Sequence, residues 1–126
     1  GCNEAEQISD NLRIFDTVES GIMSDEEHKL MDDVREAYRS RTKIGCTGCR
    51  YCMPCPNDVN IPGIFSAWNN VSLYEIDPND DFGFRMIKNN SNGADRCVGC
   101  GACEAACPQH LPIIESLQEA WKELNP

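Results

Sequence analysis

The chain has 126 residues, a formal net charge of −10 and nine cysteines, a high density of thiols for so short a protein. Its acidic balance argues against nucleic acid as a partner, because phosphates would be repelled. No apolar stretch approaches the roughly 20 residues that span a bilayer, and the polar start does not resemble a signal peptide. We therefore expect a soluble, cytoplasmic protein that binds neither nucleic acid nor a membrane.

The first 40 residues predict two amphipathic helices. Residues 3–18 carry apolar side chains at helical spacing, with Asn3 as N-cap and Glu6 as the reciprocal capping residue. The second helix opens at Ser24, with Glu27 in the same reciprocal position. Acidic side chains cover its polar side, and we interpret them as a solvated face, because neighbouring acids on a helix point apart.

A cysteine run follows, with Cys46, Cys49 and Cys52 at three-residue steps and Cys55-Pro56 at its end. Cysteine, glycine and proline are so dense here that we expect loops rather than regular structure. After this run, residues 61–74 predict a core-facing helix that is opened by Pro62.

A turn then leads into a short helix through Phe82, Met86 and Ile87. The last helix is opened by Pro112 and carries apolar residues along one side. Because no strand pattern of useful length appears, the expected class is all-α, with the cysteine runs in loops between helices.

The second cysteine run is Cys97, Cys100 and Cys103 followed by Cys107-Pro108, which gives C-x2-C-x2-C-x3-C-P. This spacing is typical of bacterial iron–sulfur proteins, in which the fourth cysteine ligates the other of two clusters. We therefore expect two [4Fe–4S] clusters with exchanged fourth ligands. One would take Cys46, Cys49, Cys52 and Cys107, and the other Cys97, Cys100, Cys103 and Cys55. The closing interval of the first run is one residue shorter, which leaves the destination of Cys55 open.

Other uses of the cysteines fit their spacing less well. A disulfide framework is disfavoured because cysteines only two residues apart pair with strain. Four-cysteine zinc sites use two C-x2-C pairs and need no third and fourth cysteine in each run. Zinc nevertheless remains a substitute for iron and sulfide in aerobic preparations. Cys2 lies far from both runs in the sequence and is interpreted as a free thiol. His110 is interpreted as a surface residue or as one that contacts a ligand without binding the metal itself.

The segment around the first run is basic, since no acidic residue occurs between Glu36 and Asp58. Its cations are Arg39, Arg41, Lys43 and Arg50. They either form a solvated linker or lie near the first cluster and raise its reduction potential. The second interpretation predicts unequal potentials, the higher at the first run, because the second run has Asp95 and Glu104 beside Arg96.

The sequence also resembles a known family. The stretch Ile44 to Pro56, followed by Ile61-Pro62-Gly63-Ile64-Phe65 and later by Cys107-Pro108-Gln109-His110, is similar to the C-terminal dicluster extension of iron–sulfur aldo/keto reductases. Residues 1–40 look like the helices after the last strand of that family's barrel. The resemblance implies two regions, 1–40 from the end of the barrel and 41–126 as a ferredoxin-type helical dicluster domain.

By this resemblance the chain is the C-terminal part of an NAD(P)-dependent oxidoreductase whose barrel stands upstream. Positions matching Gln7 and Asn11 would face the adenine end of a nicotinamide dinucleotide in that family. The family's catalytic residues have no counterpart here, so the fragment itself is not expected to be an enzyme. Its partners would be the barrel of the parent chain and a redox protein or small electron carrier.

Two functions follow from these features. The first is an electron-transfer module with two [4Fe–4S] clusters. The second is a docking domain in which iron–sulfur clusters or zinc act only as structural staples, without redox turnover.

Overall fold

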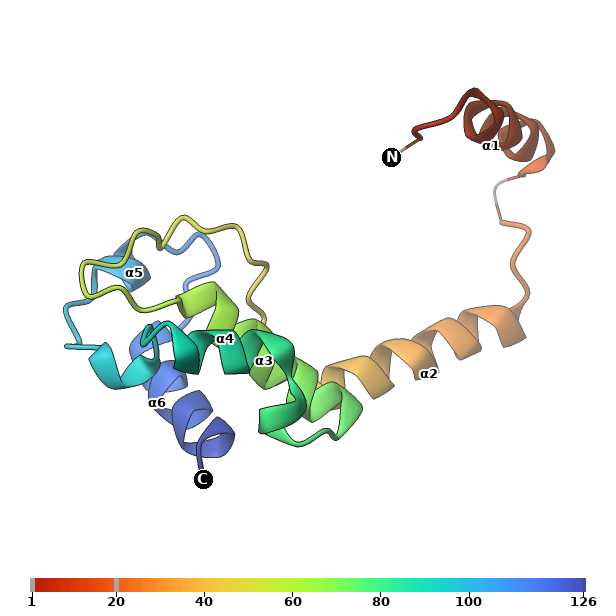
Figure 1. Ribbon diagram of the computed structural model, residues 1–126. Helices are drawn as coiled ribbons and strands as arrows, with labels where there is room; N and C mark the ends of the chain where they lie inside the picture. The colour runs from red at the N-terminus through yellow and green to blue at the C-terminus, as the bar shows by residue number, and fades with distance from the viewer. Residues whose placement is uncertain (1, 20) are drawn as a thin grey trace. The chain divides into compact units, whose positions relative to one another are not determined.

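The computed structural model describes residues 2–19 and 21–126, and within these ranges it contains helices and no strands. The all-α class predicted from the sequence is therefore confirmed. Figure 1 shows the course of the chain. The elements are α1 (Ala5–Thr17), α2 (Asp25–Arg41), α3 (Ile61–Tyr74), the 3-10 turn η1 (Pro78–Asp80), α4 (Phe82–Asn89), the 3-10 turn η2 (Ala94–Arg96), α5 (Ala102–Ala105) and α6 (Ile113–Leu124). None of the described helices is both long enough and apolar enough to cross a membrane.

Contacts within the chain define two units, one that ends at Ala37 and one that begins at Tyr38. In the first unit, every described residue is exposed. The apolar side chains that predicted amphipathic helices, such as Ile8, Leu12 and Phe15 of α1, are therefore open to solvent. Both helices form, but their apolar faces are not buried within the unit.

The caps of these two helices differ in how well the sequence predicted them. The predicted pairing of Asn3 with Glu6 is wrong by one residue, because α1 has Glu4 as its N-cap. The Gln7 side chain there accepts hydrogen bonds from the backbone N–H groups of Asn3 at 2.8 Å and Glu4 at 3.3 Å. The side-chain oxygen of Gln7 thus satisfies both free donors.

At α2 the predicted capping pair is confirmed. The backbone N–H of Ser24 donates to the Glu27 carboxylate at 2.7 Å, and the backbone N–H of Glu27 donates to the Ser24 hydroxyl at 3.3 Å. Hydrogen bonds from the backbone N–H and then from the hydroxyl of Ser24 lower the pKa of Glu27 below its ordinary value, because they favour the charged form.

The second unit has a hydrophobic core between α3, α4 and α6, which lie together in Figure 1. The largest fully buried side chains are Phe65, Phe84, Ile61, Ile64, Ile87, Ile113, Leu117, Leu124 and Val59. The predicted core faces of α3 and α6 are confirmed at these positions. Burial of such aliphatic and aromatic side chains contributes about 1.5–3 kcal/mol each.

Polar contacts tie α3 to α6 at their solvent edge. The indole N–H of Trp68 donates to the Glu123 carboxylate at 2.8 Å, and the Lys43 ammonium pairs with the same carboxylate at 3.0 Å. These contacts lower the pKa of Glu123, the indole hydrogen bond having the larger effect. On the other side of the core, Phe84 and Trp121 meet edge to face with ring centroids 5.8 Å apart.

Candidate metal centres

The two cysteine runs share a backbone conformation. Gly48 and Gly99 both have φ of 68°, and two residues later Arg50 and Gly101 have φ of 67° and 77°. These left-handed values curl each run so that cysteines three residues apart turn to one side. A Cβ at Gly48, Gly99 or Gly101 would meet nothing within 4 Å, so glycine is favoured here by its backbone freedom rather than by lack of space. Arg50 holds the same conformation without being glycine.

The repetition continues through the segments that end the runs. Three residues after Cys55 and Cys107, Asp58 and His110 have φ of 56° and 51°. Their backbone N–H groups donate to the carbonyls of Cys55 and Cys107 at 3.0 and 3.1 Å. Two turns of the same kind thus lead into α3 and α6, and both runs with their following helices are copies of one unit.

A side chain anchors each run to a core helix. The Asn69 amide of α3 accepts hydrogen bonds from the backbone N–H groups of Lys43 and Ile44 and donates to the Ile44 carbonyl at 2.9 Å. In the second run, the Glu104 carboxylate accepts from the backbone N–H of Ile114 at 2.9 Å, at the start of α6. These hydrogen bonds fix the first run to α3 and the second run to α6.

The first site is a cavity lined by Cys46, Cys49, Cys52 and Cys107, together with Ile61 and Arg50. Three of these cysteines come from the first run, and Cys107 comes from the end of the second. Cys107 is 9% exposed and belongs to the hydrophobic core. The structure thus brings Cys107, which the motif predicts as the fourth ligand, into one cavity with the first three thiols.

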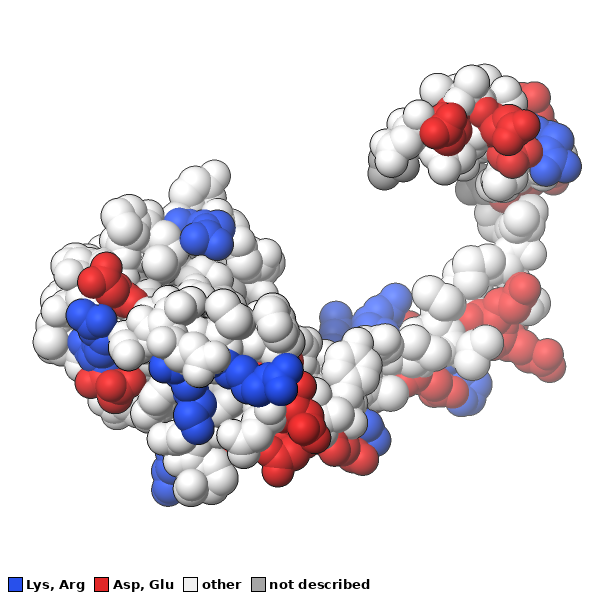
Figure 2. Space-filling view, viewed as in Figure 1, with Lys and Arg blue, Asp and Glu red and all other residues white. Residues whose placement is uncertain are grey.

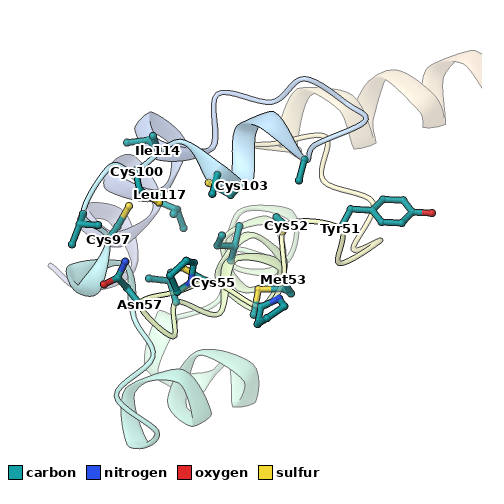
Figure 3. A pocket seen from close by; sticks show the side chains of 17 residues that line it. Tyr51, Cys52, Met53, Cys55, Asn57, Cys97, Cys100, Cys103, Ile114 and Leu117 are labelled. Carbon is teal, nitrogen blue, oxygen red and sulfur yellow. The ribbon is translucent and has the colours of Figure 1, made fainter.

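The second site is a separate cavity that is lined by Cys55, Cys97, Cys100 and Cys103. Figure 3 shows that Cys55 reaches it from the loop of the first run, whereas the other three cysteines come from the second run. The ring of Tyr51 points away from these thiols in the same view. Although the interval before Cys55 is one residue shorter, Cys55 thus still lines the same cavity as the cysteines of the second run.

Cys52 and Ile61 line both cavities, so the two sites adjoin through these residues. The middle cysteine of each run, Cys49 or Cys100, is exposed, whereas the other cysteines of the two sites are half-buried or buried. Each site therefore has one edge toward solvent and one toward the core.

Burial changes the chemistry of two thiols. It raises the pKa of Cys52, with smaller contributions from the charges of Cys46, Cys49 and Cys107. It likewise raises the pKa of Cys103, to which the neighbouring Glu104 carboxylate adds. Binding of a metal requires thiolates, so loading releases protons and is weakened as pH falls.

Other candidate ligands stand apart from the two sites. His110 is exposed and lines neither cavity, and Cys2 is an exposed free thiol that accepts a hydrogen bond from the Asn11 amide at 3.0 Å. Within residues 2–19 and 21–126, no group of three or more His, Cys, Asp or Glu side chains is arranged to hold a single metal ion. The candidate ligands are instead cysteine sulfurs in two groups of four. Cysteine thiolates are the usual ligands of iron–sulfur clusters.

The basic segment is only partly at the first site. Arg41 pairs with Glu75 at 3.3 Å, Lys43 pairs with Glu123, and neither lines the cavity. Arg39 is an exposed residue of α2. Among the four cations, only Arg50 lines the first site, and Arg41 and Lys43 instead pair with carboxylates beside α3 and α6.

The fold and these thiols define a helical iron–sulfur protein. The family model of the 4Fe-4S dicluster domain matches residues 45–112, more than half of the chain, and the chain belongs to this family. Membership supports iron–sulfur cluster binding and a role in electron transfer. A 27-residue segment is 56% identical to the acetyl-CoA decarbonylase/synthase complex subunit alpha 1 of Methanopyrus kandleri. That match covers 21% of this chain and only 4% of that protein, and no solved structure matches.

Sequence reasoning missed two features of the site. The turns at Asp58 and His110 make the repeat extend into the helices, and the signal for it was the shared Cys-Pro step in both runs. Glu104 was noted only as a charge near the second run, although its carboxylate also caps α6. No spacing rule indicates such a bond, because its partners come from different elements.

Proposed function

We propose that the chain binds two [4Fe–4S] clusters and passes single electrons between a redox partner and a larger oxidoreductase. The observation that supports this most is the pair of adjoining cavities, each lined by three cysteines of one run and the Cys-Pro cysteine of the other. When bound, such clusters supply one-electron redox chemistry.

The roles of the chain's own residues follow from their places. The first site would use Cys46, Cys49, Cys52 and Cys107, and the second Cys97, Cys100, Cys103 and Cys55 as thiolate ligands. The left-handed glycines curl the backbone around each site, and Ile61 excludes water between the two. The exposed Cys49 and Cys100 edges are where a partner protein or small carrier would approach most closely.

Anaerobic reconstitution tests this function directly. Two cubes correspond to about eight iron and eight sulfide atoms per chain. We expect that content, together with reversible one-electron reduction in a spectroelectrochemical cell. Stoichiometric zinc that iron and sulfide cannot replace, or loading with one cube only, would contradict the proposal.

A structural role is the second candidate, because the cysteines are also part of the core. Cys107 lies in it, and five other cysteines pack against it, so metal binding there would contribute folding free energy. These cysteines are Cys46, Cys52, Cys55, Cys97 and Cys103. If loaded protein resists reduction at every biological potential while metal removal unfolds it, the staple function replaces electron transfer.

We also propose that the parent protein is an aldo/keto reductase with an NAD(P)-dependent barrel. The support is the resemblance of residues 1–40 to the helices after that barrel, and the exposed apolar faces of α1 and α2. Gln7 and Asn11, whose counterparts would face the dinucleotide, here make local hydrogen bonds to Asn3, Glu4 and Cys2. The test is carbonyl reduction with NAD(P)H by the full-length gene product and its absence in the fragment.

A further inference from the structure

The two sites differ in the charged side chains around them. Arg50 is the only Lys or Arg between residues 44 and 84, and it lines the cavity of the first site. No Asp, Glu, Lys or Arg lines the cavity of the second site. Figure 2 shows a basic patch on the loops at the top of the second unit, with mostly uncharged atoms around it.

The charge of Arg50 is not neutralised locally. Among the described residues, its guanidinium forms no ion pair, whereas Arg41, Lys43 and Arg96 are paired with Glu75, Glu123 and Asp58. Those three ion pairs leave little net charge at their positions. A cation without an ion-pair partner is not offset by a neighbouring negative charge. Arg50 is therefore the main source of positive electrostatic potential at the first site.

At the second run, Glu104 carries a charge of the opposite sign. Glu104 follows Cys103 directly, and its half-buried carboxylate is held by the N–H of Ile114 at 2.9 Å. Because this bond restrains the side chain, its negative charge keeps a fixed place on α5, one residue from Cys103.

We propose, on the basis of the function proposed above, that Arg50 and Glu104 make the two sites unequal, so that the first site has the higher reduction potential. One electron from an electrode or a low-potential one-electron donor lowers the charge of a site by one unit, without bond formation or proton transfer. A nearby cation stabilises that added charge, and a nearby anion opposes it. The first electron therefore resides at the site of Cys46, Cys49, Cys52 and Cys107.

The experiment is a redox titration of the fully loaded protein, followed by visible absorption and paramagnetic resonance. We expect two separate one-electron steps. At a fixed applied potential, Arg50→Gln should lower the ratio of reduced to oxidised first site about three- to tenfold. A tenfold change corresponds to about 59 mV for a one-electron step. The second step should change less than about twofold, because Arg50 lines the cavity of the first site and not that of the second.

Matched variants isolate the charge. Arg85→Gln removes the same charge from an exposed position of α4 that lines neither site, and Arg50→Lys keeps the charge at the loop. Both should titrate like the parent protein. Glu104→Gln keeps a side-chain oxygen for the N–H of Ile114 and should raise the ratio of the other step about three- to tenfold.

The inference and the proposed function fail differently. If the loaded protein contains two cubes and is reduced reversibly, but the steps coincide or Arg50→Gln moves them no more than Arg85→Gln does, the inference is wrong and the electron carrier stands. If the cubes are absent or cannot be reduced, the proposed function is wrong. Should Arg50→Gln not assemble, Glu104→Gln decides the inference, because a step that it leaves unmoved contradicts it. The shifts should also shrink from about 10 mM to about 1 M salt, as the Debye length falls from about 30 Å to about 3 Å.

Discussion

The two cysteine runs share their left-handed positions and closing turns but differ in side chains and in the stretch before the last cysteine. Gly48 and Gly99 share one φ value, and each run ends in a turn that leads into a core helix. At the next left-handed position, however, the first run has Arg50 and the second has Gly101. The repeated backbone thus sets where the thiols lie, whereas the side chains between them set how the two sites differ.

Substitution of the exchanged cysteines should have the largest effect and tests this comparison directly. Because Cys107 lines the first site and Cys55 the second, each run depends on the other for its fourth thiol. Cys107→Ser should therefore lose or convert the cluster held by the first run, and Cys55→Ser the cluster of the second. Iron analysis and paramagnetic resonance of the two variants measure this effect, which is about half of the bound iron.

A control is available for that experiment. Cys2→Ser changes an exposed thiol outside both sites and should leave the iron content unchanged. Loss of the second-run signal alone in Cys107→Ser would show that each run ligates its own cluster, and the exchange would then be wrong.

The left-handed positions allow a second test, of stability. Gly101→Ala places a Cβ at φ of 77°, which should cost about 1–2 kcal/mol although nothing lies within 4 Å of the new atom. Arg50→Gly removes such strain but adds freedom to the unfolded chain, so its effect should stay within about 1 kcal/mol of zero. Denaturant unfolding of the loaded proteins measures both.

Gly45→Ala is the matched control, since this glycine has open space and no positive φ. It should change the free energy of unfolding by only a few tenths of a kcal/mol. An equal loss in Gly45→Ala and Gly101→Ala would mean that the left-handed backbone is not what makes Gly101 necessary.

The sequence predicted which cysteines come together better than what surrounds them. Cysteine spacing is local, so the grouping of the thiols in two cavities could be predicted, whereas the ligand sets stay a prediction. The faces of α3 and α6 were predicted because their apolar partners lie in the same unit. Arg41 and Lys43 are close to Cys46 in sequence, but ion pairs with Glu75 and Glu123 take them elsewhere. Those pairings join distant segments, which no local pattern reveals.

The first unit shows the opposite limit. Helical periodicity predicted α1 and α2, yet their apolar residues, including Phe15, are exposed. Periodicity indicates that a face is suited to burial without saying what covers it. For the same reason, local capping chemistry moved the start of α1 from Asn3 to Glu4 without altering the helix itself.

The smallest expected effect is that of removing the charge of Glu123, which links the two copies. Trp68 of the first copy donates to Glu123 of the second, and Lys43 pairs with the same carboxylate. The folded-state pKa of Glu123 is lowered from 4.5, so its stabilising contribution is present above about pH 4.5 and is lost as pH falls through the folded value. Because the side chain is about half exposed, Glu123→Gln should cost less than about 1 kcal/mol at pH 7.

This pH dependence separates the ion from the hydrogen bond. The difference in unfolding free energy between the parent protein and Glu123→Gln should be largest near neutral pH and decline below pH 4.5, because the parent carboxylate then becomes neutral as well. Trp68→Phe should cost about 1–3 kcal/mol, since it removes the donor and part of the buried ring. Glu119→Gln, on an exposed position of α6, controls for the loss of one charge. A Glu123→Gln penalty that persists unchanged at pH 4 would place the effect in packing rather than in the charged pair.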